Sequence, residues 1–436
     1  MATNPLYELQ PGKLSFFIPR GVAYYASSTS SRVEEYEELV NRGWRRSGTL
    51  YYKQNLKRSC CPHYTIRLDP TAFKPRRDQK KAINRWNNFI LGPEYMRKAA
   101  RLCPKTREQK KHRKQTFNLL AQVHEAEYSN VNRPIDPTTK RNIEPAHKFE
   151  VNIESDSFSL AKFNVFLKYQ KAVHNEPADR WNQSSFKRFL CTGISQKAVR
   201  DSDGKNEQKL GSYHQCYRLD GQLVAVAVLD LLPHGVSSVY IFYDPDYEQW
   251  EFGKLSAMRE IAMTLEGGYQ HYYMGFYIHS CPKMRYKATF QPQYILDPET
   301  YTWDLLDDEV CKKLDKRRYV SLSHDRRAAL EKGGSLEDSG PPPGTTEELS
   351  FPGEEEMSLF DIHMPGVMTI EEIQTQLDLD HWRLLVAGTL VEMMDLVAWE
   401  DSNIRDPQAI KGIMAELAAV LGPKVVENSA VLMFES

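Results

Sequence analysis

The chain lacks any long hydrophobic run and any leader-like start. Its longest apolar stretch, Leu223 to Leu232, is far shorter than the roughly 20 residues that cross a bilayer. Residues Met1 to Arg20 contain no charged start that leads into an apolar segment. We therefore expect a protein without a membrane partner, placed in the cytoplasm and with the nucleus as a further compartment.

Cysteine is also scarce, and no residue type dominates the composition. The 7 cysteines are an odd, scattered set among 436 residues, which excludes a secreted disulfide framework. With 24 prolines, 23 glycines and 41% hydrophobic residues, collagen-like and fully disordered classes are excluded as well. The length predicts two or three domains, and the sequence gives no indication of oligomeric state.

Net charge is low, yet charge of one sign is almost absent from two segments. Between Lys74 and Lys114 there are 15 Lys and Arg residues against 3 acids, whereas Gly333 to Ser436 carries 20 acids against 4 bases. A basic excess of this size favours binding to a polyanion such as a nucleic acid backbone. We expect the phosphate-binding residues to be Lys74, Arg76, Arg77, Lys80, Lys81, Lys110 and Lys111.

Hydrophobic periodicity indicates a mixed sheet with a helix packed across it. A strand is expected at Tyr213–Arg218, and an Asp220-Gly221 turn leads into the nearly unbroken apolar run Leu223–Leu231. Further strands are expected at Ser237–Tyr243 and Tyr272–Tyr277, with a helix opening at Gly253 between them. This order predicts an α+β fold.

Composition shifts divide the chain into five parts. They are a small mixed N-terminal unit at 1–73, a basic helical segment with a linker at 74–148, a sheet domain at 149–331, a disordered acidic linker at 332–356 and a helical acidic extension at 357–436. Within the extension, apolar faces predict helices at Leu384–Leu396 and Ile410–Leu421.

Four strings are too specific to reflect composition alone: GWRRSG at 43–48, CCPHYTIR at 60–67, SVYIFYDPDY at 238–247 and YYMGFYIHSCPKMRYK at 272–287. Together they resemble the eukaryotic, fungal-type arginyl-tRNA–protein transferases over residues 14–75 and 155–330. The resemblance implies a GNAT-like sheet domain and an enzyme that moves arginine from arginyl-tRNA to the α-amino group of proteins beginning with Asp, Glu or oxidised Cys. Such proteins are thereby marked for degradation through the N-degron and ubiquitin pathway, and the basic segment would bind tRNA.

One departure from the family concerns its metal centre. The family joins a C-x-x-C pair to a Cys-Cys pair to hold zinc or an iron-sulfur cluster, but here Ala23 and Ala26 stand in the first pair and only Cys60 and Cys61 remain. Two adjacent cysteines do not complete a tetrahedral site. His63 is an alternative third ligand or a structural residue. We expect the centre to be absent, and transfer itself to need no cofactor.

An aminoacyl ester is already activated, so one proton acceptor and good positioning suffice. Asp230 is the first catalytic candidate because it ends the apolar run, where a carboxylate needs a task or a partner. The alternative is a strand-end carboxylate that caps a loop amide. His214 and Gln215 lie in the neighbouring strand, and alternation allows only one of them to face the same cleft.

Cations and aromatic residues follow the last expected strand. They suit an acidic acceptor residue or the 3′ end of tRNA equally well, and a solvated basic loop is the alternative. Asp244 could receive the guanidinium of the transferred arginine, or it could belong to a simple turn. The substrate-binding candidates are therefore Lys283, Arg285, Tyr286, Lys287, Tyr277, His279 and Asp244.

Two other classes remain open at this point. A GNAT-type N-acetyltransferase would need a glycine-rich run of amides at a helix start to hold pyrophosphate, and WEFGKLSAM offers only Gly253. A non-catalytic RNA-binding protein would explain the basic segment but not the strings around the sheet.

Overall fold

The computed structural model describes residues 6–8, 23–28, 30–108, 111, 116–200, 207–332, 358–386 and 388–433. The chain divides into two compact units. One comprises Asp69–Met274, and the other combines Met1–Leu68 with Gly275–Ser436. This division differs from the five predicted parts, which remain a prediction, and the acidic linker at 332–356 lies almost entirely outside the described residues. None of the described helices has the length and apolar character needed to cross a bilayer.

The Asp69–Met274 unit is built on an antiparallel run of strands. The strand order is β6 (Phe149–Ser155), β8 (Glu207–Leu219), β9 (Gln222–Leu231) and β10 (Gly235–Tyr243), with β7 (Lys197–Arg200) pairing beside β8. The strand β11 (His271–Tyr277) then runs parallel to β10, with Gly235 opposite His271. Every strand expected here is confirmed, and so is the α+β class.

The turn between β8 and β9 is the one that the Asp-Gly pair predicts. Asp220 and Gly221 have φ angles of +50° and +83°, and a tight hairpin of this kind requires positive φ at both central positions. The register shifts once between Tyr217 and Arg218, and beyond this irregularity Ser212 lies opposite Asp230.

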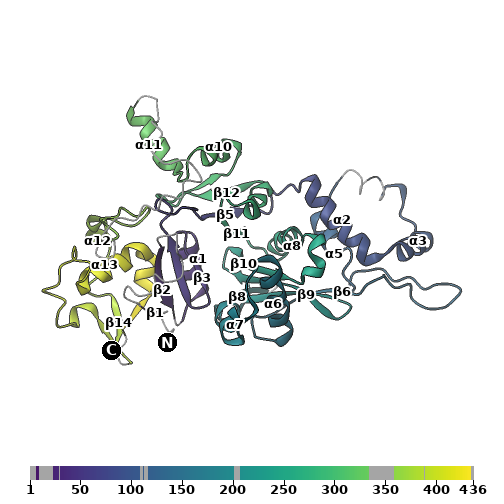
Figure 1. Cartoon of the computed structure of the whole chain (residues 1–436), viewed down its shortest axis with the longest axis horizontal. Helices are drawn as coiled ribbons and strands as arrows, with labels where there is room; N and C mark the ends of the chain where they lie inside the picture. The colour runs from purple at the N-terminus through teal and green to yellow at the C-terminus, as the bar shows by residue number, and fades with distance from the viewer. Residues whose placement is uncertain are drawn as a thin grey trace. The chain divides into compact units, whose positions relative to one another are not determined.

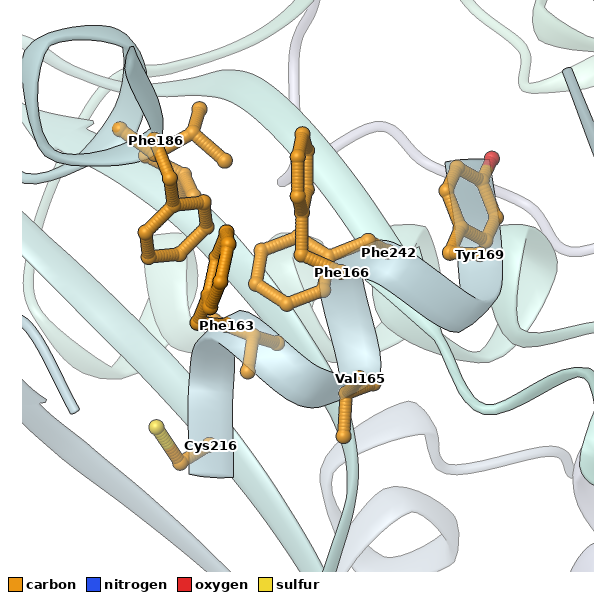
Figure 2. Close-up of a cluster of buried hydrophobic side chains, with 10 residues drawn as sticks. Phe163, Val165, Phe166, Tyr169, Phe186, Cys216 and Phe242 are labelled. Carbon is orange, nitrogen blue, oxygen red and sulfur yellow. The ribbon is translucent and has the colours of Figure 1, made fainter. Parts of the chain in front are cut away.

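Helices cover both faces of this sheet. One face carries α6 (Leu160–Val173) and α7 (Gln183–Leu190), whose aromatic side chains pack on Val226, Val228 and Phe242. Figure 2 shows Phe163, Phe166 and Phe186 gathered with Phe242 in this cluster. The long helix α8 (Phe252–Glu266) packs against the other face, where Gln215 contacts Met263. Short 3-10 turns, η2 (Ala178–Arg180) and η3 (Pro245–Trp250), connect these elements.

The basic segment is helical, as expected, and one face of it is packed. Its helices are α2 (Arg77–Leu91), α3 (Pro93–Leu102) and α5 (Leu119–His124). Trp86 is 4% exposed and its ring makes edge contacts with Phe149 and Phe252. The packed face leaves the charged residues of α2 on the opposite side.

In the other unit, the C-terminal extension continues the sheet of the N-terminal residues. The strand order is β15 (Thr389–Glu392), β14 (Arg383–Val386), β16 (Ala430–Met433), β1 (Leu6–Glu8), β2 (Ala23–Ser28), β4 (Leu50–Gln54) and β3 (Arg45–Ser47). Figure 1 shows the yellow β14 near the purple β1 and β2, although they lie at opposite ends of the sequence. The helix α1 (Val33–Val40) belongs to the same unit.

The prediction of a helix at Leu384–Leu396 is wrong. This stretch forms the hairpin of β14 and β15 followed by a 3-10 turn, η6 (Met393–Asp395). Gly388 has a φ of +82° and permits the tight turn, while a short apolar run does not distinguish a strand from a helix. The second expected helix is confirmed as α13 (Ile410–Leu421), beside α12 (Ile370–Gln376) and α14 (Pro423–Asn428).

The extension contacts the N-terminal residues through one buried side chain and through an exposed ion pair. The Trp44 indole, fully buried, donates to the carbonyl of Val420 at 3.2 Å, and its ring meets Tyr24 edge-on at 6.2 Å. Lys424 forms an ion pair with Glu38 at 3.0 Å. Packing between the extension and the N-terminal residues therefore contributes to the order of this part of the chain.

Glu416 of α13 gives a pH-dependent stability. Burial raises its pKa from 4.5 to about 7. Between these values the folded state keeps a proton that the unfolded state loses, so stability falls as pH rises through this window. We expect Glu416→Gln, which can still accept from the amide of Leu359, to stabilise the chain above pH 7 by about 1 kcal/mol, discounted for partial exposure. Thermal unfolding at about pH 5 and pH 8 tests this; Glu427→Gln, at an exposed position, is the control and should show no such difference.

The remaining elements of this unit follow or pair with the 276–290 segment in the chain or the sheet, or lie within it. They are the antiparallel strands β5 (Tyr64–Leu68), β12 (Gln293–Leu296) and β13 (Trp303–Leu305), the helices α9 (Pro282–Arg285), α10 (Asp308–Lys316) and α11 (Leu322–Lys332), and the turn η4 (Tyr286–Thr289).

Candidate functional site

A chain of three side chains connects the end of β11 to α10. The hydroxyl of Tyr277 lies 2.6 Å from Nδ1 of His279, and Nε2 of His279 lies 2.7 Å from Oδ1 of Asp315. Tyr277 is buried, the His279 side chain is 11% exposed and the Asp315 side chain is 55% exposed. Both imidazole nitrogens are therefore fixed, and the chain runs from the core to the surface.

In this set of three linked side chains, the electrostatics favour a charged carboxylate at the exposed end, Asp315. The hydrogen bond from His279 lowers the pKa of Asp315, and burial raises the pKa of the Tyr277 hydroxyl. Arg285 donates to the same carboxylate oxygen at 3.3 Å, and its own side chain is 55% exposed. An exposed guanidinium and an exposed carboxylate thus lie side by side next to an oriented histidine.

The other predicted substrate-binding residues of this segment differ from Arg285 in their exposure and contacts. Lys283 is exposed on α9. Lys287 is half-buried and donates to the carbonyl of Phe276 at 2.9 Å, so it supports the segment from within. Tyr286 is half-buried, with its ring edge-on to Phe290 at 6.3 Å. Only Lys283 and Arg285 of this set present their charge to solvent.

The N-terminal residues pack against the same segment. The ring of His63 lies 5.2 Å from the ring of Phe276, and the guanidinium of Arg45 lies 5.1 Å above it. Burial and then the charge of Lys287 lower the pKa of His63 to about 4, so the ring is neutral at pH 7. His63 is a packing residue here.

Asp244 has the geometry of a turn residue. Its side chain accepts from the amide of Asp246 at 3.2 Å, which caps η3, and from Lys168 at 2.6 Å. The carboxylate already has a cation, so the turn alternative explains its contacts.

Asp230 lies deep in the sheet and is fully buried. Its Oδ1 accepts from the hydroxyl of Ser212 at 2.6 Å, and the same hydroxyl accepts from the amide of Ile194 at 2.8 Å. This arrangement resembles the alternative that the sequence left open, a strand-end carboxylate that caps a loop amide. Here the Ser212 hydroxyl lies between the carboxylate and the amide of Ile194. The geometry favours a structural role for Asp230 over a direct catalytic one.

His214 and Gln215 point to opposite faces of the sheet. His214 is on the Asp230 face, where its Nε2 lies 2.9 Å from the carbonyl of Leu190 at the end of α7. Burial and then the charge of Lys162 lower its pKa to about 4. Gln215 is on the α8 face and accepts from the hydroxyl of Tyr217 at 2.6 Å. Both side chains are buried, so the sheet does not bring the three candidates together at an open site.

We expect Asp230→Asn to act on stability. Replacing the carboxylate weakens a hydrogen bond between buried partners, which costs about 1–3 kcal/mol. Turnover should stay within a few-fold of the parent chain at a temperature where both are folded. Urea unfolding and single-turnover kinetics measure the two effects. A loss of two to four orders of magnitude in turnover with unchanged stability would instead restore the direct catalytic role.

The basic segment presents unpaired cations along one side of α2. Arg77, Lys81 and Arg85 are exposed at four-residue spacing, together with Lys74 before the helix. Arg85 pairs with Glu251 at 2.9 Å and Arg76 with Asp78 at 3.6 Å. Lys80 is half-buried beside the ring of Phe117, Lys111 is exposed and Lys110 lies outside the described residues. Within the described part of the segment, Lys74, Arg77 and Lys81 have no carboxylate partner.

At the place of the family's metal centre the sequence supplies two adjacent thiols, those of Cys60 and Cys61. Cys60 is half-buried and Cys61 is exposed, while Ala26 is buried in β2 opposite Tyr51. In the described ranges no group of three or more His, Cys, Asp or Glu side chains could hold a metal ion. The residues present do not fit a four-ligand site, so no step of the chemistry is assigned to one.

Sequence reasoning missed Asp315 and Cys311. Both lie on α10, and the Cys311 thiol and the Tyr277 hydroxyl influence each other's pKa. Their four-residue spacing puts them on one helix face. That face would have been a weak signal, because nothing in the sequence indicates that α10 meets the 277–285 segment.

Comparison with known proteins finds arginyl-tRNA–protein transferases both among the family models and among the relatives. Models of the arginine-tRNA-protein transferase N terminus and C terminus match residues 19–81 and 161–297. Arginyl-tRNA–protein transferase 1 of Drosophila melanogaster is 30% identical over 67% of this chain and 80% of that protein. The Saccharomyces cerevisiae protein of the same name is 35% identical over 59% of this chain but only 48% of its own length. This chain thus spans about half the length of the yeast relative.

A bacterial relative has a different name. An aspartate/glutamate leucyltransferase of Pseudomonas fluorescens is 32% identical over 68% of this chain and 95% of that protein. The similarity therefore extends over nearly the whole length of a protein whose name specifies both of the acidic residues.

Proposed function

The chain belongs to the arginyl-tRNA–protein transferase family, and from this membership we propose that it transfers arginine from arginyl-tRNA to the α-amino group of proteins with acidic N-terminal residues. The observation that carries the proposal is the family match, supported by an exposed Arg285–Asp315 pair beside His279. The family match favours this activity over acetyl transfer and over RNA binding without catalysis.

An N-terminal Asp or Glu carries a negative side-chain carboxylate and a positive α-ammonium group, and the site likewise contains groups of both signs. We assign the side-chain carboxylate of an N-terminal Asp or Glu to Arg285 and Lys283, and the α-ammonium group to Asp315. A guanidinium binds a carboxylate with two parallel hydrogen bonds, and an acceptor without an acidic side chain forgoes those bonds. The name of the bacterial relative, which specifies aspartate and glutamate, supports this assignment.

His279 is assigned as the proton acceptor. In the structure Nε2 donates to Asp315; when the ammonium group takes over that carboxylate, the imidazole proton sits on Nδ1, which donates to Tyr277, and Nε2 accepts a proton from the ammonium group. The neutral amine then attacks the aminoacyl ester carbonyl. The new C–N bond forms, the C–O bond to the tRNA ribose breaks, and the ribose oxygen receives the proton that the attacking nitrogen loses as it becomes an amide. The imidazolium lies between the Asp315 carboxylate and the Tyr277 oxygen, which stabilise its charge.

Three broader assignments follow the family. The basic segment binds the tRNA phosphates through Lys74, Arg77 and Lys81. The sheet domain is GNAT-like, supported by the antiparallel run that ends in β10, the following helix α8 and the parallel strand β11. Oxidised Cys serves as a further acceptor, and the products enter the N-degron pathway.

The test is incubation with radiolabelled arginyl-tRNA and peptides that begin with Asp, Glu or Ala. We expect label on the Asp and Glu peptides and at least about tenfold less on the Ala peptide, the factor that corresponds to about 1.4 kcal/mol. Coenzyme A derivatives should not be consumed. Equal labelling of all three peptides would contradict the acceptor assignment, and no labelling would contradict the transfer itself.

A further inference from the structure

A cavity of about 390 Å³ lies where the C-terminal extension meets the N-terminal residues and the β12–β13 hairpin. Its wall includes Arg42 and Lys57, Glu299 and Tyr301, and His363 and Glu372. The volume falls in the range of small-molecule sites, roughly 300–1,000 Å³. None of these residues takes part in the site described above.

Cations without counter-charges gather at this cavity. The guanidinium of Arg42 and the ammonium of Lys53 each lie 4.6 Å from the centre of the Tyr301 ring. Lys53 is 4% exposed, and its Nζ donates to the Tyr301 hydroxyl at 3.1 Å and to the Arg42 carbonyl. No carboxylate in the described part of the chain pairs with either side chain.

The remaining donors are also unused. Nε of Arg42 is buried and has no hydrogen-bond partner among the described residues. Its contact with the carbonyl of Ala419, at 3.5 Å, occupies only one terminal nitrogen. Lys57 is exposed, with no partner in the described ranges. Uncompensated buried cations are costly and call for a counter-ion.

The two carboxylates of the wall are already engaged elsewhere. Glu299 pairs with Arg327 and accepts from the Tyr319 hydroxyl at 3.0 Å. Glu372 accepts from the amide of Thr369 at 2.8 Å, as part of the cap of α12. Neither pairs with Arg42 or Lys53. Among the described residues, three cations (Arg42, Lys53 and Lys57) therefore outnumber the one carboxylate of the wall that has no cationic partner, Glu372.

The backbone of the wall adopts unusual conformations. Tyr301 and His363 have φ angles of +58° and +48°, which side chains other than glycine rarely adopt. Gly366, at +71°, approaches Pro298 so closely that a Cβ would lie 2.4 Å from its carbonyl oxygen. Strained residues of this kind persist where the surrounding structure requires them, and they cluster at ligand sites.

We propose that this cavity binds a small organic molecule through an oxyanion group, either a phosphate or a carboxylate. Arg42 and Lys57 contact the oxyanion, and the positive charge of Lys53, next to the Tyr301 ring, attracts it further. The apolar side chains of Val367 and Met368 face the organic part of the ligand. Burial and the neighbouring Arg42 lower the pKa of Lys53, an effect that a bound anion opposes. Because the wall combines the extension with the N-terminal residues, the ligand stabilises their contact.

The test uses the full chain and inorganic phosphate, by calorimetry and thermal unfolding in the absence of tRNA. We expect one site and a higher unfolding temperature with phosphate. Lys57→Glu, at an exposed position, should weaken binding at least about tenfold by repulsion. Lys312→Glu, an exposed change in the same unit and outside the cavity wall, should leave binding unchanged. Absence of binding to the parent chain, or equal binding by Lys57→Glu, would overturn the proposal.

Two further arms identify the source of the oxyanion. Competition by adenosine monophosphate but not by succinate assigns a phosphate ligand, and the reverse assigns a carboxylate. Protection of Lys57 from chemical modification by tRNA, with no effect of any small oxyanion, would show that a nucleic acid occupies the cavity and would overturn the small-molecule assignment.

Discussion

His279→Ala should lower the rate of arginine transfer by about two to four orders of magnitude, the usual contribution of a positioned proton acceptor. The ring is held by Tyr277 on Nδ1 and by Asp315 on Nε2, so one orientation is fixed before substrate arrives. The loss should fall on the chemical step, because the cations assigned to the acceptor side chain are untouched. Single-turnover kinetics with an Asp-initiated peptide measure it.

Three companion measurements separate catalysis from folding. His324→Ala changes an exposed histidine of the same unit, on α11, and should keep the parent rate. Added imidazole should restore part of the activity of His279→Ala, which a purely structural role would not allow. Asp315→Asn should weaken acceptor binding as well as turnover, because this carboxylate is assigned to the α-ammonium group. A parent-like rate for His279→Ala would remove the histidine from the mechanism.

Local sequence signals predicted the sheet well because its strands are long and their turns are explicit. The apolar run Leu223–Leu231 can only be buried on both faces, and Asp220-Gly221 fixes the hairpin before it. The extension was harder: the run from Leu384 fits a helix or a strand, and only pairing with the distant β16 decides between them. Pairing between the two ends of a chain leaves no local signal.

The candidate site was predicted only in part, for a related reason. The string at 272–287 pointed to Tyr277, His279 and Arg285, and these do lie together. Their carboxylate partner, Asp315, comes from a helix whose contact with that segment depends on tertiary packing. Asp230 stood out because a charge that ends an apolar run needs a partner. The sequence could not reveal that Ser212, in the paired strand, meets this need.

Reversing three charges in the basic segment should have the largest effect on tRNA binding. Lys74, Arg77 and Lys81 are exposed and have no carboxylate partner in the described ranges, so each is available to a phosphate. Changing all three to Glu should weaken tRNA binding at least about tenfold at low salt and lower the slope of log affinity against log salt by about 2 to 3. Filter binding at several salt concentrations measures both quantities.

The matched control reverses three exposed cations of the same unit that lie outside the basic segment: Lys171, Arg188 and Lys209. Net charge changes equally in both triple variants, so a general electrostatic effect would weaken tRNA binding in both. We expect only the basic-segment variant to lose affinity and slope, and to do so for tRNAs of any sequence, because phosphate contacts carry no base information. If both variants lose affinity equally, the cations of α2 act only through net charge. If neither does, tRNA is bound elsewhere on the chain and the basic face of α2 is simply solvated.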